Sequence, residues 1–316
     1  MTIAVALLAG ALAASWFVPM LLERVDLRRH DPLPLIVAWL ISMGGTVLAV
    51  VTGVGLLLAP DHGGAHSLLA VIHWCWAALR HGSPPGIDVI AGLSGAALLL
   101  AFLVRLLIVA ARGARRRALQ REEKLAVLRL AARRRPGSPR TLWLAHDRPL
   151  AFSLAGGQGV IVATEGLVRH LDRKAVDAVL EHERAHLRGR HHLLVACADV
   201  LSAALPFTPL FTKAPSAVRK LVELAADTAA ARACGPAAVH RALLGIAEGG
   251  TPRTALAMGD EAVEVRLARL RGEPTQPGTV SRLVFCGLTG MTAAILPTFT
   301  GACVLLGIVA VTCPPG

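Results

Sequence analysis

Two histidines four residues apart, His182 and His186, have the spacing in this sequence that most directly indicates chemistry. On a helix with about 3.6 residues per turn, both imidazoles lie on one face, where two ring nitrogens can bind one metal ion. Glu183 follows His182 and is rotated by about 100° around the helix, so its carboxylate can approach a water molecule without binding the metal itself. The pattern predicts a zinc hydrolase site with Glu183 as the general base.

A catalytic zinc ion takes three protein ligands, and two acids downstream are candidates for the third. Glu223 and Asp227 are also four residues apart, in an alanine-rich segment predicted to be helical over 217–233, so they share a face. Two acids on one helix face can also simply be solvated. In the functional interpretation Glu223 binds the metal, and Asp227 accepts a hydrogen bond from a ligand histidine. The spacing alone allows either acid to reach the metal.

The elements that must position these residues lie in the region 112–282, which has a globular composition. We predict short strands at 142–144 and 159–163, and a glycine-rich turn at 155–159 that leads into the second strand. Asp172 is a plausible N-cap for the helix that carries the two histidines. The predicted helices span 119–135, 167–171, 173–188, 192–205 and 217–233, with Pro206 and Pro209 between the last two.

The composition is that of a membrane protein. Of the 316 residues, 54% are hydrophobic and 17% are charged, whereas a soluble domain carries about a quarter charged residues. Four apolar segments are long enough to cross about 30 Å of hydrocarbon, and we predict membrane spans at 2–22, 33–59, 89–111 and 283–311. Arg105 lies near the end of the third span, from which its long side chain can reach the headgroups.

The arginines determine the predicted orientation. Arginine is frequent between the first two spans and in the run from 112 to 140, whereas the loop 61–88 contains a single arginine, Arg80. By the positive-inside rule, that run and the region after it are cytoplasmic, and both termini are external to the plasma membrane. The predicted organisation is three spans in 1–111 with an external loop at about 60–88, a cytoplasmic zinc peptidase domain in 112–282, and a fourth span with a short external tail in 283–316.

The net charge of +12 could also indicate a nucleic-acid-binding protein. The basic run directly follows an apolar segment and contains no aromatic residue for base stacking. We therefore expect membrane lipid as a partner and no direct binding of nucleic acid. None of the six cysteines is in a CxxC pair, so a cysteine zinc site is not expected. Cys75 and Cys313 both lie on the predicted external side, and whether they pair stays open.

Three segments resemble the membrane gluzincins, a group of zinc peptidases: VIVATEGL at 160–167, VLEHERAHL at 179–187 and ELAAD at 223–227. The pattern is similar to that of two families, the BlaR/MecR signal-transducing peptidases and the HtpX and CAAX-prenyl endopeptidases. The resemblance covers roughly 142–272 in motif order, and the order of spans resembles the BlaR/MecR layout. The segment PFTPL at 206–210 also resembles the proline-flanked break that those proteins carry between their two metal helices.

The resemblance implies a mainly α integral membrane protein with four transmembrane helices and a cytoplasmic HExxH zincin domain that carries a few short strands. It implies that His182, His186 and Glu223 hold Zn²⁺, that Glu183 is the catalytic base, and that Asp227 supports a ligand histidine. In zincins the strand equivalent to 159–163 often lies beside the substrate, so a peptide is expected to pair with its edge.

The sequence departs from these families at two points. We expect no penicillin-binding sensor domain, and therefore no sensing of beta-lactams. An aspartate often follows the motif helix in the family, but His191 and His192 stand there. Extra polar contacts near the site are one interpretation of this pair, and we favour an ordinary helix face.

Three functions remain open at this point. The first is a regulatory protease that cuts itself or a cytosolic winged-helix repressor similar to BlaI/MecI. The second is an HtpX-like protease for quality control of membrane proteins. The third is a non-enzymatic transducer that is stabilised by zinc, which the presence of Glu183 disfavours because a structural metal site needs no base. We favour the first.

Overall fold

A computed structural model describes residues 2–28, 30–58, 87–134, 141–156, 159–248 and 259–271. The predicted fourth span, the loop at 60–88, Cys75 and Cys313 lie outside these residues. Within them, three helices are long and apolar enough to cross a membrane. Helices predominate, as the composition and periodicity predict, and a few short strands accompany them.

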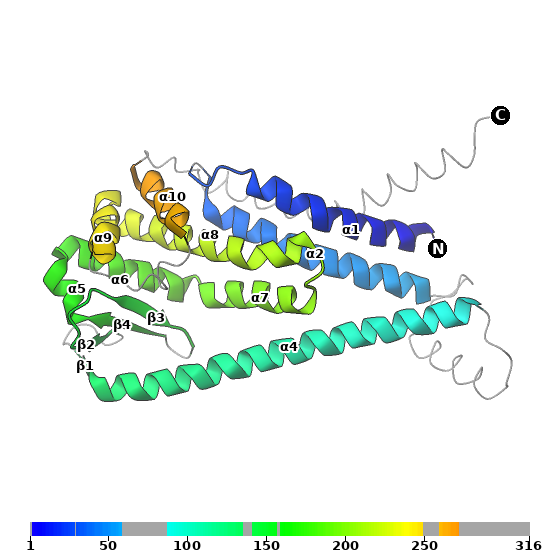
Figure 1. The fold of residues 1–316 in the computed structure, drawn as a ribbon, viewed down its shortest axis with the longest axis horizontal. Coiled ribbons are helices and arrows are strands. Elements are labelled where there is room, and N and C mark those ends of the chain that lie inside the picture. The colour runs from blue at the N-terminus through cyan, green and yellow to red at the C-terminus, as the bar shows by residue number, and fades with distance from the viewer. Residues whose placement is uncertain are drawn as a thin grey trace.

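The first two apolar segments form an antiparallel helix pair, α1 (Thr2–Glu23) and α2 (Pro32–Leu58). Both helices are almost free of charge, and α2 has no charged residue at all. The predicted first and second spans are therefore confirmed as helices of sufficient length. They pack against each other side by side (Figure 1).

The third apolar segment continues far beyond its predicted end. Helix α4 (Ile87–Ala131) has 45 residues, which is about 67 Å at 1.5 Å per residue and roughly twice the thickness of the hydrocarbon layer. It crosses the lower side of the molecule in Figure 1 and ends below the sheet. The separate helix predicted at 119–135 is therefore wrong. Arginine, leucine, alanine and glutamate are good helix formers and carry α4 through 112–131 without a break.

The sheet contains β1 (Ala132–Arg134), β2 (Thr141–Leu144), β3 (Ala151–Leu154) and β4 (Val160–Thr164), in the order β1-β2-β4-β3. The predicted strands β2 and β4 are confirmed within one residue, and they are parallel, with Leu142 opposite Val162. The sequence analysis did not predict β1 and β3. Because β4 pairs on both sides, the expectation that it offers an edge to a peptide is wrong. The edge on that side belongs to β3, which is antiparallel to β4.

The remaining helices are α5 (Glu165–His170), α6 (Arg173–Arg188), α7 (His191–Ala204), α8 (Pro209–Cys234), α9 (Pro236–Glu248) and α10 (Gly259–Arg271). Helix α6 has the predicted bounds, and the Asp172 carboxylate caps it by accepting a hydrogen bond from the Ala175 backbone N–H at 2.8 Å. Helix α8 begins eight residues earlier than predicted, because a proline at the first helical position needs no backbone donor and has a suitable φ.

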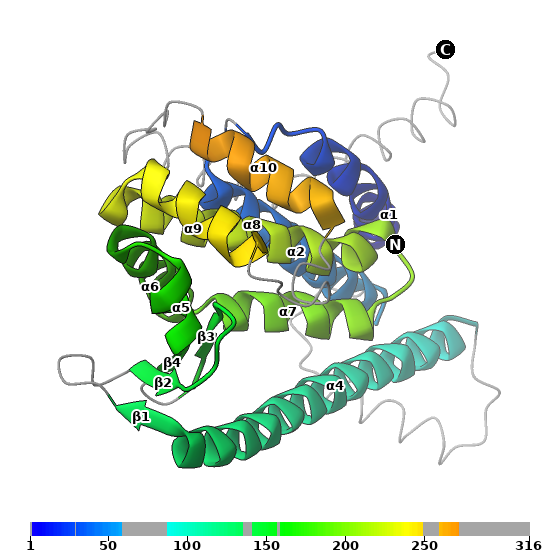
Figure 2. The ribbon, with the colours of Figure 1, turned by 60° about the vertical axis from the view of Figure 1, so that its left-hand side comes forward.

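Helix α8 connects two hydrophobic cores. Its first half belongs to a cluster with α1, α2 and α7, which includes Phe211, Trp39 and Met43. A second cluster joins the sheet, α6 and α9, and Ala230 near the end of α8 packs beside it with Ala178 of α6. Figure 2 shows α10 lying across α8 and α9 on the side opposite the sheet. The apolar hairpin α1–α2 and the globular region therefore form one packed body through α8.

Gly166 offers a direct test of packing. A Cβ atom there would lie 2.0 Å from the Asp147 backbone oxygen, and backbone cannot move aside cheaply. We expect Gly166→Ala to lower the free energy of unfolding by about 1–3 kcal/mol or more, as overpacking does. The measurement is denaturant unfolding of the detergent-solubilised protein, followed by circular dichroism.

The matched control is Gly44→Ala in α2, where a Cβ atom would meet nothing within 4 Å. Alanine is the better helix former, so this variant should be as stable as the wild type or slightly more stable. Equal stability of both variants would show that the close approach at Gly166 is absent.

Candidate metal centre

Helix α6 carries the two histidines of the motif on its polar face. An adjoining side of the helix is buried in a cluster with the sheet, through Val176, Val179 and Leu180. This packing fixes the rotation of the helix, so His182 and His186 face α8. Both side chains are mostly buried, with exposed fractions of 14% and 17%.

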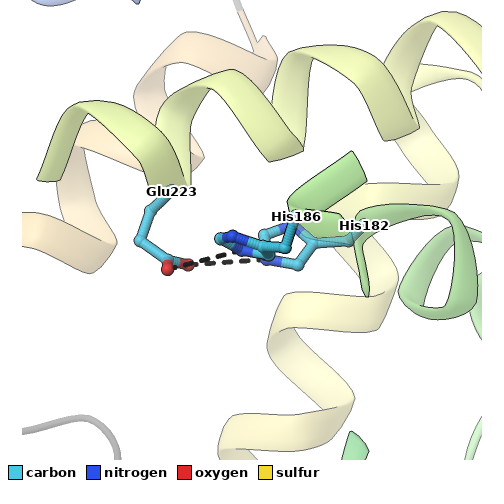
Figure 3. A group of neighbouring side chains, drawn as sticks. All are labelled: His182, His186 and Glu223. Atoms are coloured by element: carbon cyan, nitrogen blue, oxygen red, sulfur yellow. Dashed lines mark hydrogen bonds and ion pairs between the residues drawn. The ribbon is translucent and has the colours of Figure 1, made fainter. Parts of the chain in front are cut away.

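Glu223 enters the site from α8 and meets both histidines (Figure 3). Its Oε2 atom lies 3.4 Å from His182 Nε2, and its Oε1 atom lies 3.5 Å from His186 Nε2. The two Nε2 atoms are 3.1 Å apart. Among the described residues, His182, His186 and Glu223 form the group that could hold a metal ion.

These separations fit zinc. With zinc–ligand bonds of about 2.0–2.1 Å, the ligand atoms of a tetrahedral site lie roughly 3.3 Å apart. The two Nε2 atoms are 3.1 Å apart, and each has a Glu223 oxygen close to that value, Oε2 at 3.4 Å from His182 and Oε1 at 3.5 Å from His186. With one ligand atom taken from each residue, all three lie within 4.8 Å of one another. Two imidazoles and one carboxylate are also a ligand set that catalytic zinc uses. The structure thus brings together the three predicted ligands, and their binding of zinc stays a prediction.

The other ring nitrogen of His182 contacts Asp227. The distance from His182 Nδ1 to Asp227 Oδ1 is 2.9 Å, and the Asp227 side chain is only 3% exposed. A carboxylate in this position fixes the tautomer of the imidazole and leaves Nε2 free for a metal. The geometry matches the supporting role that the sequence analysis expects for Asp227.

Arg266 of α10 completes this side of the site, and the sequence analysis missed it. Its Nε and Nη2 atoms donate to the Asp227 carboxylate at 2.6 and 2.8 Å, and its Nη1 atom lies 3.8 Å from Glu223 Oε2. The same helix contacts the loop between α1 and α2, because Arg269 donates to the Leu27 backbone oxygen at 2.8 Å. No metal motif includes this arginine, so only the tertiary structure reveals its contact.

His191 supports the second histidine. Its Nδ1 atom lies 2.9 Å from His186 Nδ1, and its side chain is buried. The chain reaches this position through Gly189, where a Cβ atom would lie 2.5 Å from the His191 ring, and through Arg190, which has a φ of 48°. The favoured interpretation of His191 as part of an ordinary helix face is therefore wrong, whereas His192 is exposed and lines the cleft. The related families often have an aspartate at this position, and that pattern could have indicated that the residue here contacts the site.

Glu183 faces the sheet edge. The side chain and the backbone of Ser153 in β3 both form hydrogen bonds with its carboxylate. Burial raises the pKa of Glu183, although the nearby His182 and the Ser153 contacts oppose that rise. A carboxylate with a raised pKa is a better proton acceptor near neutral pH than an exposed one.

The ionisable groups of the site balance one another when no metal is bound. Burial by itself lowers the pKa of His182, but hydrogen bonds to Asp227 and Glu223 reverse this and raise the pKa to about 10. Burial opposes the ionisation of Glu223, yet the hydrogen bond and charge of His182 lower its pKa to about 2. Burial similarly opposes the charge of Asp227, and Arg266 and His182 hold its pKa well below the usual range. His182 and Arg266 are then positively charged, and Glu223 and Asp227 are negatively charged.

A cleft of about 660 Å³ opens beside the cluster, lined on one side by His186 and Glu223. Arg117 of α4 and Arg219 and Lys220 of α8 also line it. The cleft is large enough for several residues of a peptide, since ligand pockets commonly measure about 300–1,000 Å³.

A model of peptidase family M48 matches residues 114–274 of the sequence. This chain belongs to that family. The matched segment contains the whole His182, His186 and Glu223 cluster, together with Glu183, Asp227 and Arg266, so the cluster lies in a peptidase domain.

A protease HtpX homolog from Desulforapulum autotrophicum is 33% identical to this chain over 81 residues, which are 25% of the chain and 26% of that protein. The alignment thus spans about a quarter of the relative's length. No solved structure matches the chain. The expected relationship to the HtpX peptidases is confirmed, whereas no comparison supports features specific to BlaR/MecR.

The raised pKa of His182 predicts how the metal-free protein responds to pH. The pKa in the folded state, about 10, lies above the ordinary histidine value of 6.5, so protonation of His182 stabilises the fold. This contribution is complete below about pH 6.5 and is lost as the pH rises toward 10. In metal-free protein, we expect the free energy of unfolding to fall between about pH 7 and pH 9, by at most about 1.4 kcal/mol per pH unit.

The control for this measurement is a second histidine outside the site. His182→Gln should remove most of the pH dependence, whereas His170→Gln should retain it, because His170 lies outside the site and its Nδ1 atom contacts the Gly166 backbone oxygen. A slope that survives in His182→Gln would contradict the assignment.

Proposed function

We propose that this chain is a membrane-anchored, zinc-dependent endopeptidase with His182, His186 and Glu223 as the metal ligands. The observation that carries the proposal is that the two Nε2 atoms approach to 3.1 Å and that each has one oxygen of the Glu223 carboxylate at 3.4–3.5 Å. Membership of a peptidase family and three helices of membrane-spanning length support it. A zinc ion held there would supply a Lewis acid that acidifies a water molecule and polarises the scissile carbonyl.

The side chains around the cluster transfer protons and hold the ligand histidines in position. The Glu183 carboxylate accepts the proton of the attacking water and then transfers it to the nitrogen of the leaving amine. Its raised pKa suits both steps, because the group can hold the proton between them. Asp227 and His191 keep the Nε2 atoms of His182 and His186 directed at the cluster through their contacts with the Nδ1 atoms.

A substrate peptide fits best along β3. This strand is at the edge of the sheet, and Ser153 lies within hydrogen-bond reach of Glu183. A peptide that extends the sheet at this edge would form backbone hydrogen bonds and would pass beside the catalytic carboxylate. The orientation, with the peptidase region in the cytoplasm, rests on the arginine-rich part of α4.

Two classes of protein are candidate substrates. A cytosolic repressor of the BlaI/MecI kind remains one candidate, and the resemblance in span order supports it. The alternative is a membrane protein that requires quality control, and the similarity to a protease HtpX homolog supports that candidate. The similarity is a direct observation on the sequence, so we now favour the alternative.

The first test removes the general base. Glu183→Gln keeps the shape of the side chain but cannot accept a proton, so we expect zinc to be retained at wild-type stoichiometry and proteolysis to fall by about 10²–10⁴-fold. The measurement combines metal analysis of the purified protein with a comparison of protein N-termini between cells that express the wild type and cells that express the variant.

The identity of the fragments distinguishes the candidates. New N-termini that come from misfolded membrane proteins support quality control, and a single cytosolic repressor fragment supports regulation. Near-normal cleavage by Glu183→Gln would exclude this mechanism. If wild type and variant both add no N-termini to those of cells that lack the protein, the non-enzymatic transducer is favoured.

The second test separates a metal ligand from its supporting residue. Glu223→Ala removes a bond to the metal and a negative charge, so zinc occupancy should collapse. Asp227→Ala leaves all three ligands in place, and we expect zinc to bind about 10–100-fold more weakly. Titration of zinc into both metal-free variants measures the difference.

Asp199→Ala is the matched control, because Asp199 also pairs with an arginine, Arg219, and also lines the cleft. Its zinc affinity should equal that of the wild type, since no contact joins Asp199 to a ligand histidine. If Asp227→Ala is harder to refill than Glu223→Ala, the two roles must be exchanged.

A further inference from the structure

The cleft beside the metal cluster carries more positive than negative charge. Apart from the metal cluster and its supporting residues, four of the described residues that line the cleft are charged. These are Arg117 of α4, Asp199 of α7, and Arg219 and Lys220 of α8. Three cations against one carboxylate leave two positive charges in excess. A cleft with such a wall attracts a substrate group of negative charge.

Two of these cations lie on the same side of α8 as Glu223. Arg219 and Lys220 precede it by four and three residues, which places them about 40° and 60° to either side of it around the helix. They are about 4.5–6 Å nearer to the start of the helix. An extended peptide advances about 3.3 Å per residue. The two cations therefore face a substrate residue within about two positions of a peptide bond held at the metal cluster.

Arg219 is held in position and still has donors for a ligand. Its Nη2 atom donates to both oxygens of Asp199, at 2.6 and 2.7 Å. Among the described residues, these are its only hydrogen bonds, although a guanidinium has five N–H groups in a rigid fork. The side chain is 40% exposed. Asp199 therefore fixes the position of the guanidinium and leaves its other N–H groups able to bind a second carboxylate.

The other two cations have no carboxylate of their own. In the part of the chain that the structure describes, neither Lys220 nor Arg117 forms an ion pair, and both residues are exposed. Arg117 lies near the start of α7, because burial, Arg190 and Arg117 together lower the pKa of His192. His192 lines the same cleft. Positive charge therefore reaches the cleft from α4 as well as from α8.

Helix α4 is held at this level by the turn that follows β3. The Nη2 atom of Arg121 donates to the Gly156 backbone oxygen at 2.6 Å. Arg121 lies one helical turn beyond Arg117, and Gly156 lies three residues beyond Ser153. Ser153 is the residue of β3 that contacts Glu183. A peptide that pairs with β3 and passes Glu183 therefore continues toward Arg117.

We propose that this peptidase selects substrates with an acidic side chain within about two residues of the cleaved bond, and that Arg219 and Lys220 bind its carboxylate. The inference rests on the proposed function, because it concerns the cleft of the same site. Arg117 adds positive charge along the path of the peptide. The ligand is a peptide rather than a lipid headgroup, because the cations share the cleft with His186 and Glu223 and lie one helical turn from the latter.

The test uses the zinc-loaded, full-length protein in phosphatidylcholine nanodiscs and a library of peptides made from a proteome digest. Mass spectrometry of the products gives the residues on both sides of each cleaved bond. We expect aspartate and glutamate to be enriched at one position within two residues of that bond. Matched peptides with glutamate or glutamine there should differ about 10-fold in kcat/KM, chiefly through KM, as a charge-assisted hydrogen bond predicts. Added salt should reduce this ratio.

Charge reversal shows which residues read the acidic side chain. Lys220→Glu should invert the preference, so that the glutamine peptide is cut faster than the glutamate peptide, and Arg219→Gln should bring the ratio close to one. Lys174→Glu is the matched control, because Lys174 is an exposed lysine of α6 that does not line the cleft. It should keep the wild-type ratio. Metal analysis of each variant should give the zinc content of the wild type.

The outcomes separate this inference from the function on which it rests. Cleavage that depends on Glu183 but shows no enrichment of acidic residues overturns the specificity and leaves the endopeptidase standing. An acidic preference that survives in both Lys220→Glu and Arg219→Gln overturns the assignment to these residues. Absence of any cleavage that depends on Glu183 overturns the endopeptidase and the specificity with it. If Lys220→Glu differs from the wild type only in nanodiscs that contain phosphatidylglycerol, the cations bind headgroups and the proposal is wrong.

Discussion

The Asp227 carboxylate, held between His182 and Arg266, joins the three helices on which the site depends. His182 belongs to α6, Asp227 to α8 and Arg266 to α10, and the contacts are 2.9, 2.6 and 2.8 Å long. Burying a carboxylate is unfavourable unless its oxygens are paired. Both oxygens of Asp227 have partners here, so the network tolerates only arrangements in which α6, α8 and α10 meet in this way.

The charge pattern also explains why the site is prepared for a divalent cation. Without metal, His182 carries a proton because Asp227 and Glu223 surround it, and that proton occupies the place of the expected ion. Metal binding must displace it, so the affinity for metal increases with pH over the range in which His182 would otherwise stay protonated. Arg266 limits the surplus negative charge that Glu183, Glu223 and Asp227 would otherwise present together.

The sequence predicts those parts of the site that depend on helical spacing. Helix α6, its cap at Asp172 and the shared face of His182 and His186 follow from local geometry. The contacts of Arg266, His191 and Ser153 arise between elements that are remote in sequence or joined by a left-handed turn, and no periodicity reports them. The two unpredicted strands have the same origin, because short segments adopt whichever structure their neighbours pair with. The length of α4 instead follows from the good helix formers that continue it through 112–131.

Helix α8 joins the apolar helices to the metal site, because this one rigid element packs against the former and carries residues of the latter. Its first turns pack with α1 and α2, and its middle carries Glu223 and Asp227. A displacement of its membrane end would move Glu223 relative to the histidines of α6, and a tetrahedral site tolerates little such movement. The approach of the Glu223 carboxylate to within 3.4–3.5 Å of both Nε2 atoms therefore requires that the α1–α2 hairpin and the peptidase domain keep a fixed relation. That requirement gives a physical reason for a peptidase of this kind to fold as one body with its membrane helices.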